Sequence, residues 1–224
     1  MNLIFQSRIF FNNSSILLIL EDNRILDSMF PSDILPKVYP KEPAPQEKVE
    51  IDDVLSSNIF NVMLNRRSQR KFEEREIEDW KIDIIFAAAD TAPTAGGFQG
   101  FEIYHLKDTK LKQNLIKAAN NQPYVNAPLV LVFCSNPSRI NLNFDSEVLN
   151  KFSIQDATLA AGYAQLAAHA LGLSSIWIGM FNEHLLKEVV GTDLAPSSIL
   201  CIGYPKKMLI PKPKRNLTDL IHTV

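Results

Sequence analysis

The sequence predicts a globular domain of mixed α/β class. Helical and strand patterns alternate from residue 51 to residue 204, and the longest helical stretch is followed directly by a short apolar strand. The composition agrees with a globular protein, since 46% of the 224 residues are hydrophobic and 21% are charged. The formal net charge of −2 points to no nucleic-acid partner.

The amino-terminal part of the chain is expected to be separate from this domain. Five of the thirteen prolines lie between positions 31 and 45, and proline at that density continues neither a helix nor a central strand. The apolar stretch at 16–20 lacks the length of a membrane span and the cleavage site of a signal peptide. We therefore expect residues 1–50 to form an extension with a proline-rich linker, and residues 51–224 to form the main domain.

Apolar spacing locates the elements of the main domain in order. Helices are predicted over 51–65, 76–90, 109–120, 153–171 and 182–190, and strands over 101–106, 127–134, 174–178 and 197–204. The longest helix is expected to begin at Ser153, where Ser-x-x-Asp resembles a capping box, and to end before Gly172. Because it is apolar nearly all round, it should lie at the centre of the domain or in a dimer interface.

The two cysteines indicate the cellular compartment of the protein rather than a catalytic or metal-binding role. Cys134 and Cys201 each lie in a short apolar run, with no metal-binding spacing. We expect both to be core residues of a cytoplasmic protein without disulfides. No metal site is predicted.

The densest polar cluster is residues 66–71, which contain four cations and the hydroxyl of Ser68. Guanidinium groups satisfy the many acceptors of a phosphate monoester with charge-assisted hydrogen bonds. The alternative interpretation is a solvated basic helix end, which the helix dipole favours. The pattern Ser68-x-x-Lys71 also occurs in penicillin-recognising enzymes, but their accompanying motifs are absent from this sequence.

Three further segments could contact a ligand. The loop 92–100 contains paired glycines that allow close backbone approach, although it could be a plain turn. At 173–181 a strand ends in Gly179, just before a helix capped by Asn182. Gly203-Tyr204-Pro205 precedes a basic carboxyl end, whose usual meaning is a solvated charge run.

These four segments resemble the nitroreductase-like flavoprotein family, in its order and at about its spacing. Residues 66–70 are similar to its Arg-Arg-Ser-x-Arg phosphate segment, and residues 92–99 to its Ala-Pro-Ser-Ala-Gly-Asn-x-Gln loop. Residues 153–179 resemble its central helix and following strand, and the carboxyl end its Gly-Tyr-Pro and Lys-Pro-Arg. The resemblance implies an α+β fold with a central, mainly antiparallel sheet flanked by helices, in an interlocked homodimer with flavin mononucleotide (FMN) at the subunit interface.

The resemblance also implies which residues bind the cofactor. Arg66, Ser68, Lys212 and Lys214 would hold the phosphate, with Arg67 beside them, and Arg70 would reach the pyrimidine side of the flavin. The backbone of the segment Ile178, Gly179 and Met180 would approach flavin N5. Pro93, Thr94 and Gly97 would come from the partner subunit.

The sequence departs from the family pattern at three points. Gly97 replaces the usual Asn, so a side-chain amide beside the flavin is lost. Gly100-Phe101 stands where Pro-Trp is common, which would widen the substrate side. Lys214 replaces Arg, which keeps the charge but loses the bidentate fork.

The function implied is an FMN-dependent oxidoreductase that uses NADH or NADPH to reduce nitro, quinone or similar small acceptors by ping-pong hydride transfer. Flavin N5 would carry the chemistry, so no catalytic side chain is predicted. The four histidines are dispersed and are expected to be structural or surface residues. Two alternatives remain at this point: a flavin dehydrogenase of the azoline-oxidising type, and a flavin-binding protein with little turnover.

Overall fold

The computed structural model describes residues 59–207, 209–210 and 214–224. They belong to the second of two compact units, Met1–Glu42 and Pro43–Val224. The predicted linker, the apolar stretch at 16–20 and the first part of the helix predicted over 51–65 lie outside the described residues. The predicted domain boundary at residue 50 also lies there and stays a prediction.

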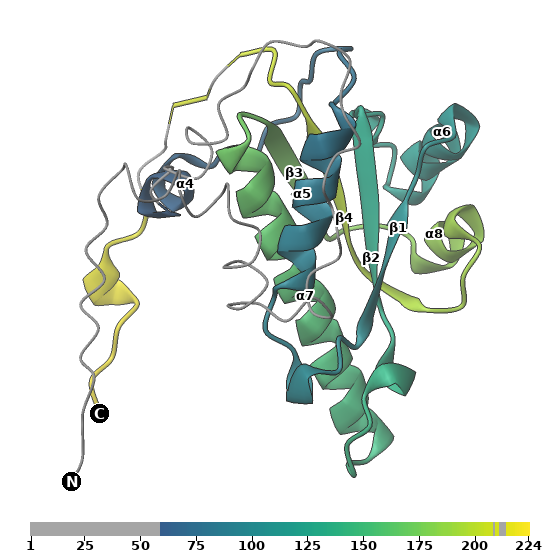
Figure 1. Ribbon diagram of the computed structural model, residues 1–224, viewed down its shortest axis with the longest axis vertical. Helices are drawn as coiled ribbons and strands as arrows, with labels where there is room; N and C mark the ends of the chain where they lie inside the picture. Colours follow the sequence, from purple (N-terminus) through teal and green to yellow (C-terminus); the bar gives the residue numbers. More distant parts are fainter. Residues whose placement is uncertain (1–58, 208, 211–213) are drawn as a thin grey trace, which may run out of the picture. The chain divides into compact units, whose positions relative to one another are not determined.

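A four-stranded sheet forms the centre of the described unit (Figure 1). Its strands are β1 (Phe101–His105), β2 (Leu129–Ser135), β3 (Ser174–Ile178) and β4 (Ala195–Gly203). The strand order is β1-β2-β4-β3, and every neighbouring pair is antiparallel. The predicted α+β fold with an antiparallel sheet is therefore confirmed, and β3 has the bounds that the sequence predicts.

Two helices cover each face of the sheet (Figure 1). On one face lie α5 (Asp79–Asp90) and α7 (Ser146–Ala170), and on the other lie α6 (Thr109–Ala118) and α8 (Glu183–Val190). Alternate residues of β2 belong to the two cores, with Phe133 on the α7 side and Cys134 on the α8 side. Both cysteines are fully buried, which confirms their predicted place in the core.

The start of α7 differs from the prediction. The helix begins at Ser146, because the side chain of Asp145 accepts a hydrogen bond from the backbone N–H of Val148 at 2.9 Å and caps it. Ser153, predicted as the cap, lies buried inside the helix, and its hydroxyl donates to the carbonyl of Gly100 at 2.6 Å. The apparent capping box at 153–156 therefore serves a tertiary contact.

The faces of α7 are unequally covered. Its buried residues include five alanines that allow close packing on the sheet and on α5. Ile154, Leu159 and Tyr163 are 49%, 41% and 39% exposed, although they are large apolar side chains. The helix therefore lies at the centre of the unit and still presents an apolar surface.

Other element ends shift by a few residues for local reasons. The helix predicted from position 76 begins at Asp79, because Glu78 has an extended backbone with φ −61° and ψ 136°. The helix predicted to end at position 120 ends at Ala118, since Asn120 and Asn121 adopt left-handed φ of 54° and 59°. Asn182 caps α8 as predicted, by accepting from the N–H of Leu185 at 3.0 Å.

The remaining helical elements are short. The last part of the helix predicted over 51–65 is present as α4 (Ile59–Asn65). Single 3₁₀ turns lie at η1 (Ala95–Gly97), η2 (Pro123–Val125), η3 (Pro137–Arg139) and η4 (Leu217–Asp219). Within the described ranges, no helix has the length and apolar character that crossing a membrane requires.

Candidate cofactor site

The basic segment 66–73 lies beside the start of β3 and the end of β4. The backbone N–H of Gln69 donates to the carbonyl of Ser175 at 2.9 Å, and that of Glu73 donates to the carbonyl of Tyr204 at 2.8 Å. The chain after β4 returns to the same place, since the side-chain amide of Gln69 donates to the carbonyl of Lys207 at 2.6 Å. The structure therefore brings together two basic stretches that are far apart in the sequence.

Within the described part of the chain, the arginines of this segment have no acidic partners. Among the residues that the structure describes, no carboxylate forms an ion pair with Arg66, Arg67 or Arg70. Burial lowers the pKa of Arg66, and the charge of Arg67 lowers that pKa further, while the guanidinium stays charged. Ser68 is exposed, and its hydroxyl makes no hydrogen bond to the described residues. Guanidinium groups without an ion pair to the described residues, beside the exposed hydroxyl of Ser68, fit a phosphate monoester.

The three arginines do not all face one pocket. Arg67 lines a small pocket with Gln69 and His169 and donates from Nη1 to the carbonyl of Arg66 at 2.6 Å. Its buried Nε has no hydrogen-bond partner among the residues that the structure describes. Arg70 lines a different groove of about 700 Å³, where its guanidinium carbon lies 5.8 Å from the centre of the Tyr124 ring. Arg67 is therefore separated from the surface on which Arg70 lies.

The segment Ile178, Gly179 and Met180 lies at the far end of β3 from Ser175. Its backbone is held by Gln122, the residue before η2, whose side-chain amide donates to the carbonyl of Met180 at 3.2 Å. The hydroxyl of Tyr124 in turn donates to the side-chain carbonyl of Gln122.

Gln122 and Tyr124 thus connect Met180 to Arg70, although no sequence motif singles out either residue. Their short stretch lies between α6 and β2 and looks in the sequence like a plain connection. The contacts form only when the chain folds, so the sequence alone could have indicated only that Tyr124 supplies an aromatic ring.

The loop that contains Pro93, Thr94 and Gly97 lies at the opposite end of the sheet. It leads into β1, and the start of β1 is in register with the end of β2 and with Ala195 of β4. The segment 66–73 lies instead near Gly203, the last residue of β4. The two ends of β4, Ala195 and Gly203, are eight residue steps apart, a distance of about 26 Å. One chain therefore does not bring the two predicted halves of the site together.

The basic carboxyl end is described only in part. Lys214 is exposed and has no ion pair among the described residues, and Lys212 lies outside them. The preceding Gly-Tyr-Pro motif has a structural role. The hydroxyl of Tyr204 donates to Glu78 at 2.5 Å and accepts from Lys81 at 2.6 Å, which fixes the end of β4 to the start of α5.

The same contacts set the pKa of Glu78. Burial alone would raise this pKa, but the hydrogen bond from Tyr204 and the charges of Lys81 and Arg75 outweigh burial and lower it to about 2. Burial raises the pKa of Tyr204, and its bond to Glu78 adds to that shift. Glu78 therefore stays charged at neutral pH, and its contacts support the chain beside the basic segment.

The histidines have no common site. Burial lowers the pKa values of His105 and His169, and neighbouring lysines or arginines contribute in each case. His184 and His222 are exposed. In the part of the chain that the structure describes, no three His, Cys, Asp or Glu side chains gather where they could bind a metal ion.

Comparison with known proteins identifies the family. Residues 63–126 and 117–204 match the model of the nitroreductase family. The FMN reductase (NADPH) of Bacillus subtilis is 29% identical over 174 residues, which cover 70% of this chain and 70% of that protein.

Solved structures agree with the sequence match. Nitroreductase A from Vibrio parahaemolyticus superposes with a TM-score of 0.69 at 28% identity over 74% of each chain. The NADPH:FMN oxidoreductase of Vibrio harveyi, solved with NAD+, gives a TM-score of 0.69 at 26% identity over 74% of this chain and 76% of that chain. Since the family model spans residues 63–204, more than half of the chain, this protein belongs to the nitroreductase family.

Proposed function

We propose that this chain is an FMN-dependent oxidoreductase that takes hydride from NADH or NADPH and passes it to a small acceptor, such as a nitro compound or a quinone. The relatives support this function, because they include an FMN reductase that uses NADPH and an NADPH:FMN oxidoreductase. When bound, FMN supplies the hydride chemistry, in ping-pong order with the donor and the acceptor.

We base the proposal that two copies form each site on the distance between its two predicted halves, the basic segment and the loop. The segment 66–70 and the loop 93–97 lie near opposite ends of β4, about 26 Å apart along the strand. One flavin does not extend over that distance, so a complete site needs the loop of a second copy. The exposed apolar side chains Ile154, Leu159 and Tyr163 on α7 also fit burial against a second chain.

Each residue of the site then has a defined task. Arg66 and Ser68 hold the phosphate together with Lys212 and Lys214, because the basic groups supply positive charge and Ser68 a hydroxyl donor, and among the described residues no carboxylate pairs with Arg66 or Lys214. Arg70 places its charge on the pyrimidine side of the flavin and is positioned against the ring of Tyr124.

The remaining contacts are made largely by backbone. The segment 178–180, held by Gln122, approaches flavin N5. The flavin ring is covered by Pro93, Thr94 and Gly97 of the partner subunit. Both described cysteines are free and buried, which fits a protein of a reducing compartment such as the cytoplasm.

A test of shared sites uses mixed dimers of two variants. Arg66→Ala weakens the phosphate contact, and Gly97→Val distorts the loop, because a β-branched residue strains the left-handed φ of 74° at this position. Each variant alone should bind FMN weakly. A mixed dimer, prepared with two affinity tags, should recover one site of wild-type affinity, since one combination of segment and loop is intact.

Two results would overturn parts of this proposal. Two weak sites in every mixed dimer would place each flavin within a single chain. A wild-type protein that binds FMN but whose flavin absorption is bleached by neither NADH nor NADPH would exclude the reductase activity.

A further inference from the structure

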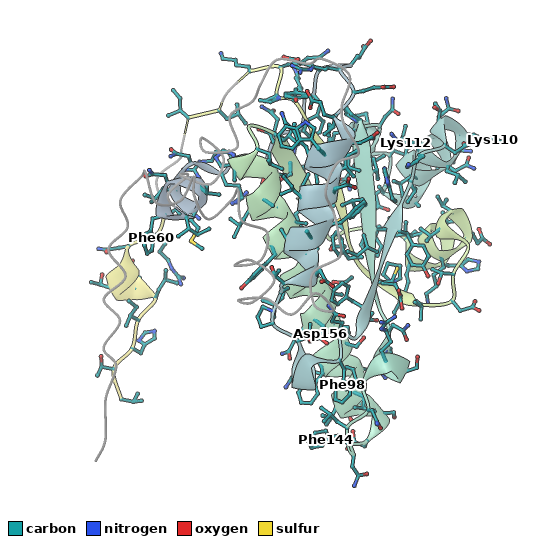
Figure 2. All side chains as sticks on the ribbon, viewed as in Figure 1. Phe60, Phe98, Lys110, Lys112, Phe144 and Asp156 are labelled. Carbon is teal, nitrogen blue, oxygen red and sulfur yellow. The ribbon has the colours of Figure 1, made fainter. Side chains whose placement is uncertain are left out.

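We propose that Asp156 is a positioning residue for the flavin site, which holds the loop 93–100 in the backbone conformation that meets the cofactor. The inference rests on the proposed function, since it concerns how one chain presents this loop to the flavin bound by the other. Figure 2 labels Asp156, in the amino-terminal half of α7, and Phe98 of the loop, which both lie in the lower part of the view.

The carboxylate of Asp156 joins the two ends of the loop. It is 2% exposed, and its two oxygens accept separate hydrogen bonds, from the backbone N–H of Ala95 at 2.9 Å and from that of Gly100 at 3.0 Å. Hydrogen bonds from backbone N–H groups to a buried carboxylate are among the stronger ones in proteins. One side chain of α7 therefore fixes the positions at which the loop begins and ends its turn.

The loop needs this support because its backbone is strained. Gln99 adopts a left-handed φ of 51° without being glycine, whereas the left-handed φ of 60° and 74° at Gly96 and Gly97 are conformations that glycine adopts without this strain. The side chain of Gln99 is held in turn by Asp90, to whose carboxylate it donates at 2.6 Å. Strained residues of this kind persist only where surrounding contacts hold them.

A second contact from α7 acts on the same turn. The hydroxyl of Ser153 donates to the carbonyl of Gly100 at 2.6 Å, so both backbone groups of Gly100 are bonded to α7. Gly100 also lies against this helix, since an added Cβ would be 3.1 Å from the carboxylate of Asp156. The end of the loop is thus defined by two buried side chains one helical turn apart.

The placement of the backbone matters more here because position 97 carries no side chain. An asparagine at this position could adjust its side chain to a ligand, whereas Gly97 can offer only main-chain groups. The geometry of those groups is set by the two fixed ends of the loop. Asp156 therefore acts on the flavin through the loop and does not touch it.

The test compares Asp156→Asn with Glu147→Gln in the full chain. Asparagine has one acceptor oxygen, and its NH₂ group would face one of the two backbone N–H donors. Glu147 is an exposed acid in the first turn of the same helix, so its change to Gln removes the same charge without touching the loop. FMN affinity, the flavin midpoint potential and the visible circular dichroism of the bound flavin are measured for both variants.

Asp156→Asn is expected to raise the Kd for FMN about tenfold, and to shift the potential and the dichroism, while Glu147→Gln matches the wild type. Ser153→Ala, which removes a neutral hydrogen bond, should raise the Kd about threefold in the same direction and provides a readout if Asp156→Asn does not fold. In mixed dimers with Arg66→Ala, Asp156→Asn should recover one site of wild-type affinity.

The outcomes separate this inference from the proposed function. If Asp156→Asn lowers only the Tm of the apoprotein and leaves FMN affinity, potential and dichroism unchanged, the residue is structural and the inference is wrong. If the wild-type protein itself does not bind FMN, the proposed function fails instead.

Discussion

The substitution Gly97→Asn should strengthen FMN binding. The family pattern that the sequence resembles has asparagine at this position, and the structure has room for it, since an added Cβ would meet no atom within 4 Å. The φ of 74° is one that asparagine tolerates better than most residues with a side chain. The variant should therefore fold and place an amide beside the flavin.

The magnitude follows from one added hydrogen bond. A neutral hydrogen bond contributes about 0.5–1.5 kcal/mol net, which corresponds to a decrease of about two- to twelvefold in the Kd for FMN. The left-handed backbone acts on the free energy of folding instead. The left-handed φ should lower the free energy of unfolding by about 1–2 kcal/mol with alanine at this position, and by less with asparagine.

Gly97→Ala is the matched control, because it imposes the same backbone restriction without the amide. Apoprotein of each form is titrated with FMN, and the affinity is taken from the quenching of flavin fluorescence. Asparagine should bind FMN more tightly than alanine. Equal Kd values for the two variants would mean that position 97 does not face the flavin.

Three further predictions concern the phosphate contacts, pH and packing. Arg66→Ala combined with Lys212→Ala should cost several kcal/mol, roughly 3–6, of FMN affinity, because two charge-assisted contacts are lost; an unchanged titration would contradict their placement. The pKa of Glu78 is lowered to about 2, so its ionised form stabilises the fold above the unfolded pKa, and this stabilisation is lost as pH falls toward 2. Glu78→Gln should therefore flatten the dependence of the unfolding free energy on pH between about 5 and 2. Gly100→Ala should destabilise the fold by about 1–3 kcal/mol in denaturant titrations, since its Cβ would lie 2.6 Å from Ile140, and an unchanged midpoint would refute this contact.

The sequence predicted the bounds of an element best where a capping residue or a glycine marks each of its ends. The bounds of β3 were predicted because Gly172 precedes the strand and Gly179 follows it, and α8 because Asn182 and Gly191 mark its ends. The start of α7 was missed because Asp145 and Ser153 are both possible caps. The local pattern does not show that Ser153 makes a tertiary contact instead of capping the helix.

The same limit applies to the site. The basic segment 66–70 is visible locally, since its cations are consecutive in the sequence. Gln122 and Tyr124 come near Arg70 and Met180 only through the packing of separate loops. Asp156 looked like part of a helix cap, yet its carboxylate bonds to a loop about sixty residues earlier. Such contacts have no local periodicity, so they became visible only in the folded chain.

The basic segment has a further consequence for dynamics. Among the described residues, its backbone pairing consists of isolated bridges, from Ser68 to Ser175 of β3 and from Phe72 to Pro205 after β4, and it is not a full strand. It can therefore open locally while the ladder between β2 and β4 stays intact. Amide protons at 66–73 should exchange with solvent faster than those of β2, and a bound anion should slow their exchange. Hydrogen exchange of this segment would therefore report anion binding separately from global unfolding.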